Sequence, residues 1–479
     1  MVKIEKDKLF FINKNASPET KAAEENKQSA NIKIDFVGNQ NITNDKGLIV
    51  QRANSDSTVD ESQGVRKVEP PISLKISNAD LSAYKTSAVK SALELSSRAS
   101  VDGQYLKWID NLPKTELKNL DNLYNTANSA KVDGSNKLVV VGMGGSRNPT
   151  EAMLDLFGIN QNVSFYSGID DISFNRFVNK LDLDKTKFMI VSKSGTTLET
   201  STAYAQLRKK LQEHFGKEDV SDSFIAVTDA SEEKSPLRKA VNNGEIKYSG
   251  LVHDDVGGRF SIFDDATVLS LAYLGADKED VRSLLKSSVS AQKEFLNPDM
   301  DKNDALKLAA FNVDCQKNGK PNANIEYFGD FFNGLSSWEK QLKNESLKHD
   351  LPTETNIGPE FLHYNAESDL ADSNKNSFYS FVNVKTDNVN ANSLYNGAKR
   401  GYKAQHPVSE IELKDLSPET IARFVELKHF ETIYTGMMLR KQTGTKVDSN
   451  DVLPELTQNN VEKYKKEVKI ELKNNSKSK

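Results

Sequence analysis

Short apolar runs alternate with longer amphipathic stretches over most of the chain. Residues 138–141 are fully apolar and β-branched, which is typical of a strand covered on both faces. The predicted strands are residues 138–141, 163–166, 188–191, 224–227, 325–328, 378–382 and 411–413; the predicted helices are residues 152–157, 198–215, 237–241, 304–318, 331–347, 392–403 and 418–440. Strands that alternate with helices predict βαβ units and parallel sheets.

The two ends of the chain are more polar than its middle. Residues 1–66 are rich in Asn, Lys, Glu and Ser, with only short apolar patches, so this segment cannot bury a core of its own. The overall apolar content of 37% is low for a globular protein, and these ends account for it. We expect a polar, partly disordered extension at residues 1–66, followed by a helical segment and a first α/β domain at residues 67–290. A second α/β domain is expected at residues 291–450, and a C-terminal helix with a tail at residues 451–479.

Composition argues against several classes of partner. The net charge of −4 provides no broad positive field for nucleic acid or an anionic membrane. The single cysteine, Cys315, excludes an internal disulfide and a zinc site built from cysteines. No apolar run approaches the roughly 20 residues that cross a bilayer, and the first residues lack the pattern of a secretory signal. These features favour a soluble protein of the cytoplasm.

A first candidate for ligand binding is the glycine-rich segment Gly142-Met143-Gly144-Gly145-Ser146, between a predicted strand and a predicted helix. In open α/β sheets, ligands bind at the carboxyl ends of strands, where helix N-termini offer free N–H groups. Glycines also let the backbone approach a ligand closely. A tight turn without a ligand would use the same glycines, so this segment alone leaves both interpretations open.

A second candidate is Ser192-Lys193-Ser194-Gly195-Thr196-Thr197, again between a strand and a helix. Four hydroxyl groups around one glycine at a helix start form a dense set of phosphate donors. The lysine precedes the glycine and the Walker spacing is absent, which favours a sugar phosphate over a nucleoside triphosphate. The alternative is a simple helix cap by Thr196 or Thr197, but a cap needs one hydroxyl and four are present.

A third candidate is Val256-Gly257-Gly258-Arg259-Phe260-Ser261, a glycine turn that leads into an arginine. Because Arg259 keeps its proton over the relevant pH range, it can stabilise a developing oxyanion. The alternative on this hexapeptide alone is an exposed arginine in a turn.

In this order and spacing, the three segments resemble the glucose-6-phosphate isomerase family, which carries a GIGGS turn, an SK(S/T)xTTxET loop and a VGGRFS turn. Residues 338–346, WEKQLKNES, are similar to the family's WxxQLxxES, and residues 458–465, QNNVEKYK, are similar to its QxGVExxK. The resemblance covers residues 137–466. It implies two sugar-isomerase-type (SIS) three-layer αβα domains with parallel-rich sheets, assembled as a homodimer.

The resemblance also implies a reaction. The family interconverts glucose 6-phosphate and fructose 6-phosphate in glycolysis and gluconeogenesis, through an enediol intermediate and without a metal or a cofactor. The substrate-binding residues that it implies are Gly145, Ser146, Ser192, Lys193, Ser194, Thr196, Thr197 and Gln458.

Four catalytic roles follow from the same resemblance. Arg259 takes the role of the cation that stabilises the enediolate, and Lys465 that of the lysine associated with ring opening. Glu345, in the xES motif, is the expected base, with Glu360 as the alternative. His363 is the histidine that aligns with the family's catalytic histidine. Without the resemblance, each of these residues has an ordinary interpretation as a solvated surface or loop residue.

Several positions depart from the family pattern. His363 lacks the family's Ser and Gln neighbours, Arg147 and Asn148 follow the GGS turn, and Lys348 and Asn460 stand where the family has glycine. The phosphate half of the site is intact, whereas the catalytic half is eroded. A non-catalytic sugar-phosphate sensor or scaffold is therefore the alternative function. An isomerase of another sugar phosphate, such as mannose 6-phosphate, is a third, because epimers are distinguished by pocket geometry.

Overall fold

The computed structural model describes residues 69–131 and 133–477, together with four short strands nearer the N-terminus. These strands form two antiparallel pairs, β1 (Lys3–Glu5) with β2 (Lys8–Phe10) and β3 (Ile42–Thr43) with β4 (Ile49–Val50). The chain divides into two units, Met1–Val68 and Glu69–Lys479. The rest of the predicted polar extension at 1–66 lies outside the described residues.

Five parallel strands form the first sheet of the second unit, in the order β10-β9-β8-β6-β7. They are β6 (Lys137–Val141), β7 (Val163–Tyr166), β8 (Thr186–Val191), β9 (Phe224–Thr228) and β10 (Tyr248–Leu251). From β6 the chain passes to β7 on one side and then to β8 on the other. The switch point of the strand order therefore lies between β6 and β8, where ligands bind in sheets of this kind.

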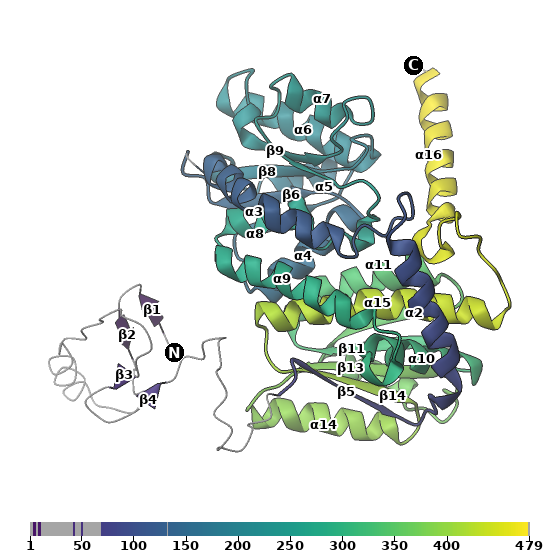
Figure 1. Cartoon of the computed structure of the whole chain (residues 1–479). Helices are drawn as coiled ribbons and strands as arrows, with labels where there is room; N and C mark the ends of the chain where they lie inside the picture. Colours follow the sequence, from purple (N-terminus) through teal and green to yellow (C-terminus); the bar gives the residue numbers. More distant parts are fainter. Residues whose placement is uncertain are drawn as a thin grey trace, which may run out of the picture. The chain divides into compact units, whose positions relative to one another are not determined.

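Helices cover both faces of the first sheet (Figure 1). Alternate residues of β6 belong to different cores, Leu138 and Val140 to one and Val139 and Val141 to the other. The first core includes α3 (Asn111–Ala130), α4 (Asn148–Leu156), α8 (Asp265–Leu274) and α9 (Lys278–Phe295); the second includes α5 (Asp171–Val178), α6 (Leu198–Phe215) and α7 (Pro236–Asn242). This arrangement confirms a three-layer αβα domain.

The second sheet has the order β12-β11-β13-β14-β5. Four of its strands are parallel, namely β11 (Asn322–Phe328), β12 (Thr353–Gly358), β13 (Ser377–Val384) and β14 (Val408–Leu413). The fifth, β5 (Ile72–Ser77), pairs antiparallel with β14. Although residues 67–290 were predicted to serve the first domain, β5 extends the second sheet. The division at residue 290 otherwise stays a prediction.

The remaining helices pack largely around the second sheet and between the two sheets (Figure 1). They are α2 (Lys85–Ala99), α10 (Asp304–Lys317), α11 (Asn333–Leu347), α12 (Phe361–Tyr364), α13 (Ala366–Asp369), α14 (Val389–Lys403) and α15 (Pro418–Gln442). The short helix η8 (Pro454–Leu456) leads into α16 (Asn459–Lys477), which extends away from the two sheets. Among the described helices, none has the length and apolar character needed to cross a bilayer.

Candidate functional site

All three candidate segments follow strands of the first sheet. Residues 142–146 come directly after β6, residues 192–197 after β8, and residues 252–259 lead away from β10. Because these strands are parallel, the three segments leave the same edge of the sheet, and the first two flank its switch point. The topology therefore brings together motifs of which the first and the last lie more than 100 residues apart in the sequence.

The first and third segments touch through their glycines. A Cβ atom at Gly145 would lie 2.5 Å from the carbonyl carbon of Gly258, a distance that no real side chain tolerates. Gly144 has a φ of +54°, and a Cβ there would meet the amide nitrogen of Gln341 at 2.9 Å. The glycines thus allow the backbones of two loops to lie in close contact. This contact sets the position of Arg259, which directly follows Gly258.

This contact gives a first testable expectation. We expect Gly145→Ala to destabilise the fold by about 1–3 kcal/mol, because backbone atoms of Gly258 must move to admit the methyl group. The measurement is the midpoint of chemical denaturation. Gly397→Ala in α14 is the control, since a Cβ there meets nothing within 4 Å and alanine favours a helix. Equal midpoints for the two variants would contradict the close contact.

The second segment opens α6 without using its hydroxyl groups as a helix cap. Thr197 is the N-cap residue, yet its side chain makes no capping hydrogen bond. Its hydroxyl lies 3.2 Å from that of Ser192, while Ser194 Oγ accepts from the backbone N–H and the hydroxyl of Thr196. Ser194 and Thr196 are exposed and Ser192 is buried. The free N-terminus of α6 and this hydroxyl cluster are suited to an anion.

Gly195 fixes the shape of this loop in two ways. Its φ of +61° is in the left-handed region, and a Cβ there would lie 2.5 Å from Ser235 Oγ. Below the loop, the Thr228 hydroxyl donates to the Ser192 carbonyl at 2.7 Å. Lys193 points towards the loop that follows β10, with Nζ 3.3 Å from the His253 carbonyl and 3.8 Å from Asp254 Oδ1.

Arg259 is buried, with 2% of its surface exposed, and each nitrogen of its guanidinium donates a hydrogen bond. Its Nε donates to Ser346 Oγ at 2.9 Å, Nη1 to Glu345 Oε2 at 3.1 Å, and Nη2 to the Glu455 carbonyl at 2.9 Å. The Trp338 indole N–H donates to the Arg259 carbonyl at 2.9 Å. Burial lowers the pKa of Arg259 and Glu345 opposes that shift. The interpretation of Arg259 as an exposed turn residue is therefore wrong.

Glu345 is held from two sides and remains partly open to solvent. Its Oε1 accepts from the Gln341 side-chain amide at 2.9 Å, and Asn148 donates to the other end of that amide at 2.9 Å. The Glu345 side chain is 23% exposed, so a ligand can reach it. The chain from Asn148 through Gln341 to Glu345 fixes the orientation of the carboxylate.

Gln341, Asn148 and Ser346 belong to this cluster, although none of them was predicted as a site residue. Gln341 and Ser346 are fixed letters of the WxxQLxxES pattern, which was the available signal. Asn148 stood out only as a departure from the family. Lys348, another departure, has φ +57°, a conformation that favours glycine, and its Nζ donates to the Pro454 carbonyl at 2.6 Å.

His363 and Glu360 lie outside the hydrogen-bonded cluster around Arg259 in the described part of the chain. Both are exposed, Glu360 immediately before α12 and His363 within it. Within the described part of the chain, neither side chain makes a hydrogen bond or an ion pair with Arg259 or Glu345.

Lys465 and Gln458 also stay outside the cluster. Lys465 is on α16, and its Nζ donates to Glu462 of the same helix at 2.8 Å. Gln458 is exposed just before that helix. One chain thus brings together the three predicted loops and Glu345, but neither His363 nor Lys465.

The fold and the arrangement of these loops define a sugar-isomerase-type α/β protein. The structure has a TM-score of 0.69 to a hypothetical protein from Thermus thermophilus, at 21% identity over 82% of this chain and 96% of that one. The TM-score is 0.68 to a glucose-6-phosphate isomerase from Chlamydia trachomatis, at 18% identity over 85% and 89%. The chain belongs to the phosphoglucose isomerase family, whose model matches residues 114–357, just over half of it.

Two curated relatives carry the name glucose-6-phosphate isomerase. One, from Clostridioides difficile, is 30% identical over 271 residues, which is 53% of this chain and 58% of the relative. The other, from Mycoplasmopsis pulmonis, is 31% identical over 257 residues, 52% of this chain and 58% of the relative. The match thus spans less than two thirds of either relative.

Proposed function

We propose that this protein is an aldose–ketose isomerase that interconverts glucose 6-phosphate and fructose 6-phosphate through an enediol intermediate. The observation that carries the proposal is the pair formed by Arg259, in the loop after β10 at the carboxyl edge of the first sheet, and Glu345 of α11. A buried cation beside a reachable, oriented carboxylate suits a reaction in which a proton moves and an oxyanion develops.

Each part of the site has a proposed role. The hydroxyl groups of residues 192–197, the N-terminus of α6 and Lys193 bind the phosphate, with Gly145 and Ser146 nearby. Glu345 moves the proton between C1 and C2 of the open sugar. Arg259 stabilises the enediolate, since its guanidinium keeps its charge in a buried setting.

Ring opening requires further groups, and we assign it to Lys465 and His363. In one chain both are exposed and stand outside the cluster around the Arg259–Glu345 pair. The proposal therefore includes a homodimer in the cytoplasm, in which the second copy or a movement of α16 completes the site, with Gln458 beside the sugar. Exposed apolar side chains on α16 support such an interface: Tyr464 at 64%, Ile470 at 52% and Leu472 at 45%.

The activity is tested with the purified full chain and fructose 6-phosphate, with glucose 6-phosphate followed through a coupled dehydrogenase. We expect turnover, and a mass near twice that of the chain by light scattering. Mannose 6-phosphate in a parallel assay tests the third alternative. Binding of fructose 6-phosphate without turnover would overturn the proposed isomerase activity and favour a non-catalytic sugar-phosphate sensor. The position of His363 and Lys465 outside the cluster around Arg259 is the observation that supports the sensor.

The phosphate role of Lys193 has its own test. We expect Lys193→Ala to raise KM for fructose 6-phosphate by about 10-fold with a small change in kcat, because the phosphate is bound equally in ground and transition states. Lys234→Ala is the matched control, since Lys234 Nζ also lies near Asp254, at 3.6 Å, outside the loop. An unchanged KM in Lys193→Ala would contradict a role of Lys193 in phosphate binding.

A further inference from the structure

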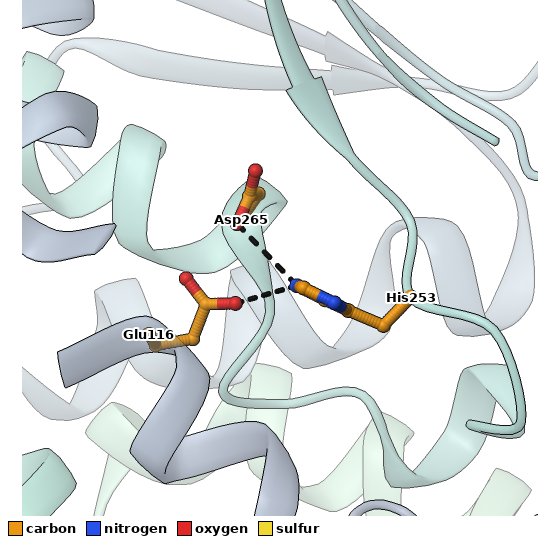
Figure 2. A group of neighbouring side chains, drawn as sticks. All are labelled: Glu116, His253 and Asp265. Carbon is orange, nitrogen blue, oxygen red and sulfur yellow. Dashed lines mark hydrogen bonds and ion pairs between the residues drawn. The ribbon is translucent and has the colours of Figure 1, made fainter. Parts of the chain in front are cut away.

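Two buried carboxylates and one imidazole meet beside the first sheet, apart from the Arg259–Glu345 pair. Glu116 comes from α3, Asp265 is the first residue of α8, and His253 lies in the loop that follows β10. Figure 2 shows the three side chains pointing towards a common centre. Glu116 has none of its surface exposed and Asp265 has 1%.

The spacing of the three donor atoms is close to that of a metal site. His253 Nε2 lies 2.6 Å from Glu116 Oε1 and 3.6 Å from Asp265 Oδ1, and all three atoms lie within 4.8 Å of one another. Zn²⁺ bonds of about 2.0–2.2 Å in tetrahedral geometry separate neighbouring donors by roughly 3.4 Å. Shifts well under the length of a bond would bring the three atoms onto one ion.

The two carboxylates of this cluster have few partners for negative charge. In the described part of the chain, His253 is the one basic group paired with either carboxylate. With both carboxylates ionised, even a protonated imidazole leaves one negative charge; burial makes that charge costly and raises the pKa of Glu116 well above its ordinary value. A divalent cation would take the place of the proton on Glu116. Moreover, Glu116 Oε2 and Asp265 Oδ1 are buried and receive no hydrogen bond. Two carboxylates and a neutral imidazole are balanced by one divalent cation.

Neighbouring groups orient the side chains of this cluster, and a cavity gives solvent access to it. The Leu251 backbone N–H donates to Asp265 Oδ2 at 2.7 Å, which leaves Oδ1 turned to the cluster and is the kind of outer contact that fixes a metal ligand. A surface cavity lined by Lys107, Asn111, Leu112, His253, Asp254 and Val256 reaches the imidazole. The cavity provides an entry path and room for a water molecule as the fourth ligand.

We propose that Glu116, His253 and Asp265 bind one Zn²⁺ ion. An imidazole nitrogen with two carboxylate oxygens suits zinc better than magnesium or calcium, which prefer more oxygen ligands. The proposed isomerisation takes no step through the ion. It joins α3 and α8 to the loop that carries Arg259, in which the His253 carbonyl also accepts from Lys193.

Zinc binding is tested by calorimetry on the full chain after treatment with a chelator and dialysis. We expect one Zn²⁺ per chain. Since loss of an outer-shell contact costs 10- to 100-fold in metal affinity, we expect Glu116→Gln and His253→Ala each to weaken binding by at least about 100-fold. His349→Ala is the control, because that histidine is 92% exposed and lies outside the cluster.

Two further measurements protect the test against variants that fold poorly. Co²⁺ in place of Zn²⁺ gives visible absorption bands in the wild type and in His349→Ala, and these bands disappear in Asp265→Asn. Zn²⁺ raises the melting temperature of the wild type by a few degrees and leaves that of Asp265→Asn unchanged. Absence of Zn²⁺ binding by the wild type, or equal affinity in Glu116→Gln, would overturn the proposal. Neither result depends on isomerase activity.

Discussion

Replacement of Glu345 by Gln is expected to lower kcat for fructose 6-phosphate by about 10²- to 10⁴-fold, the usual contribution of a general base. The amide has the size of the carboxylate but takes up no proton. The single amide oxygen can still accept from Arg259, whereas the amide NH₂ faces the Gln341 side chain, which must turn to accept from it. The coupled dehydrogenase assay measures kcat and KM separately, and KM should change little because the phosphate loop is untouched.

Two controls make this result specific. Glu360→Gln removes the alternative base, which is exposed and outside the cluster, and should leave kcat near that of the wild type. Glu354→Gln removes a carboxylate that is 64% exposed and pairs with Lys340, and should also have little effect. A large loss of turnover in Glu360→Gln, with Glu345→Gln active, would transfer the role of base to Glu360.

Much of the fold could be predicted because buried parallel strands appear in the sequence as continuous apolar runs. The predicted strand at 188–191 is the core of β8, all of whose residues are buried. The helix at 198–215 is confirmed with the same bounds, since its spacing is helical and Gly216 ends it with φ +62°. These signals are local, so a single sequence contains them.

The missed strands lie where that signal is weak. β12 has the sequence TETNIG and β10 has YSGL; each is at the edge of its sheet and partly exposed. β5 alternates apolar and polar residues, and its place beside β14 depends on a pairing over more than 300 residues. Apolar content predicts central strands, whereas edge strands are set by tertiary pairing.

The same distinction applies to the candidate site. The loops at 142–146, 192–197 and 256–261 have dense local signals of glycine and hydroxyl residues. The orienting contact of Asn148 with Gln341 spans 193 residues and has no local signature. The Glu116–His253–Asp265 cluster is similar, because Glu116 lies 137 residues before His253 and the three members stand singly in the sequence. The proposed catalytic roles of His363 and Lys465 stay predictions.

Arg259→Lys is expected to lower kcat by about 10²- to 10³-fold although the positive charge remains. The guanidinium makes three contacts in three directions, to Ser346, Glu345 and the Glu455 carbonyl. A lysine has one nitrogen on a flexible stem, so it cannot hold all three and still point at the developing oxyanion. The coupled assay measures kcat, and thermal denaturation shows whether the fold survives.

The control for this variant must separate catalysis from the general cost of losing a buried arginine. Arg238→Lys provides it, because Arg238 is also buried and bonds the carbonyls of Asp229 and Gly250 at 3.0 and 3.1 Å. Both variants should lose about 1–3 kcal/mol of stability through carbonyls left without a donor. Only Arg259→Lys should lose turnover beyond that. Equal losses of turnover in the two variants would mean that Arg259 acts by holding the loops together, without a direct part in the reaction.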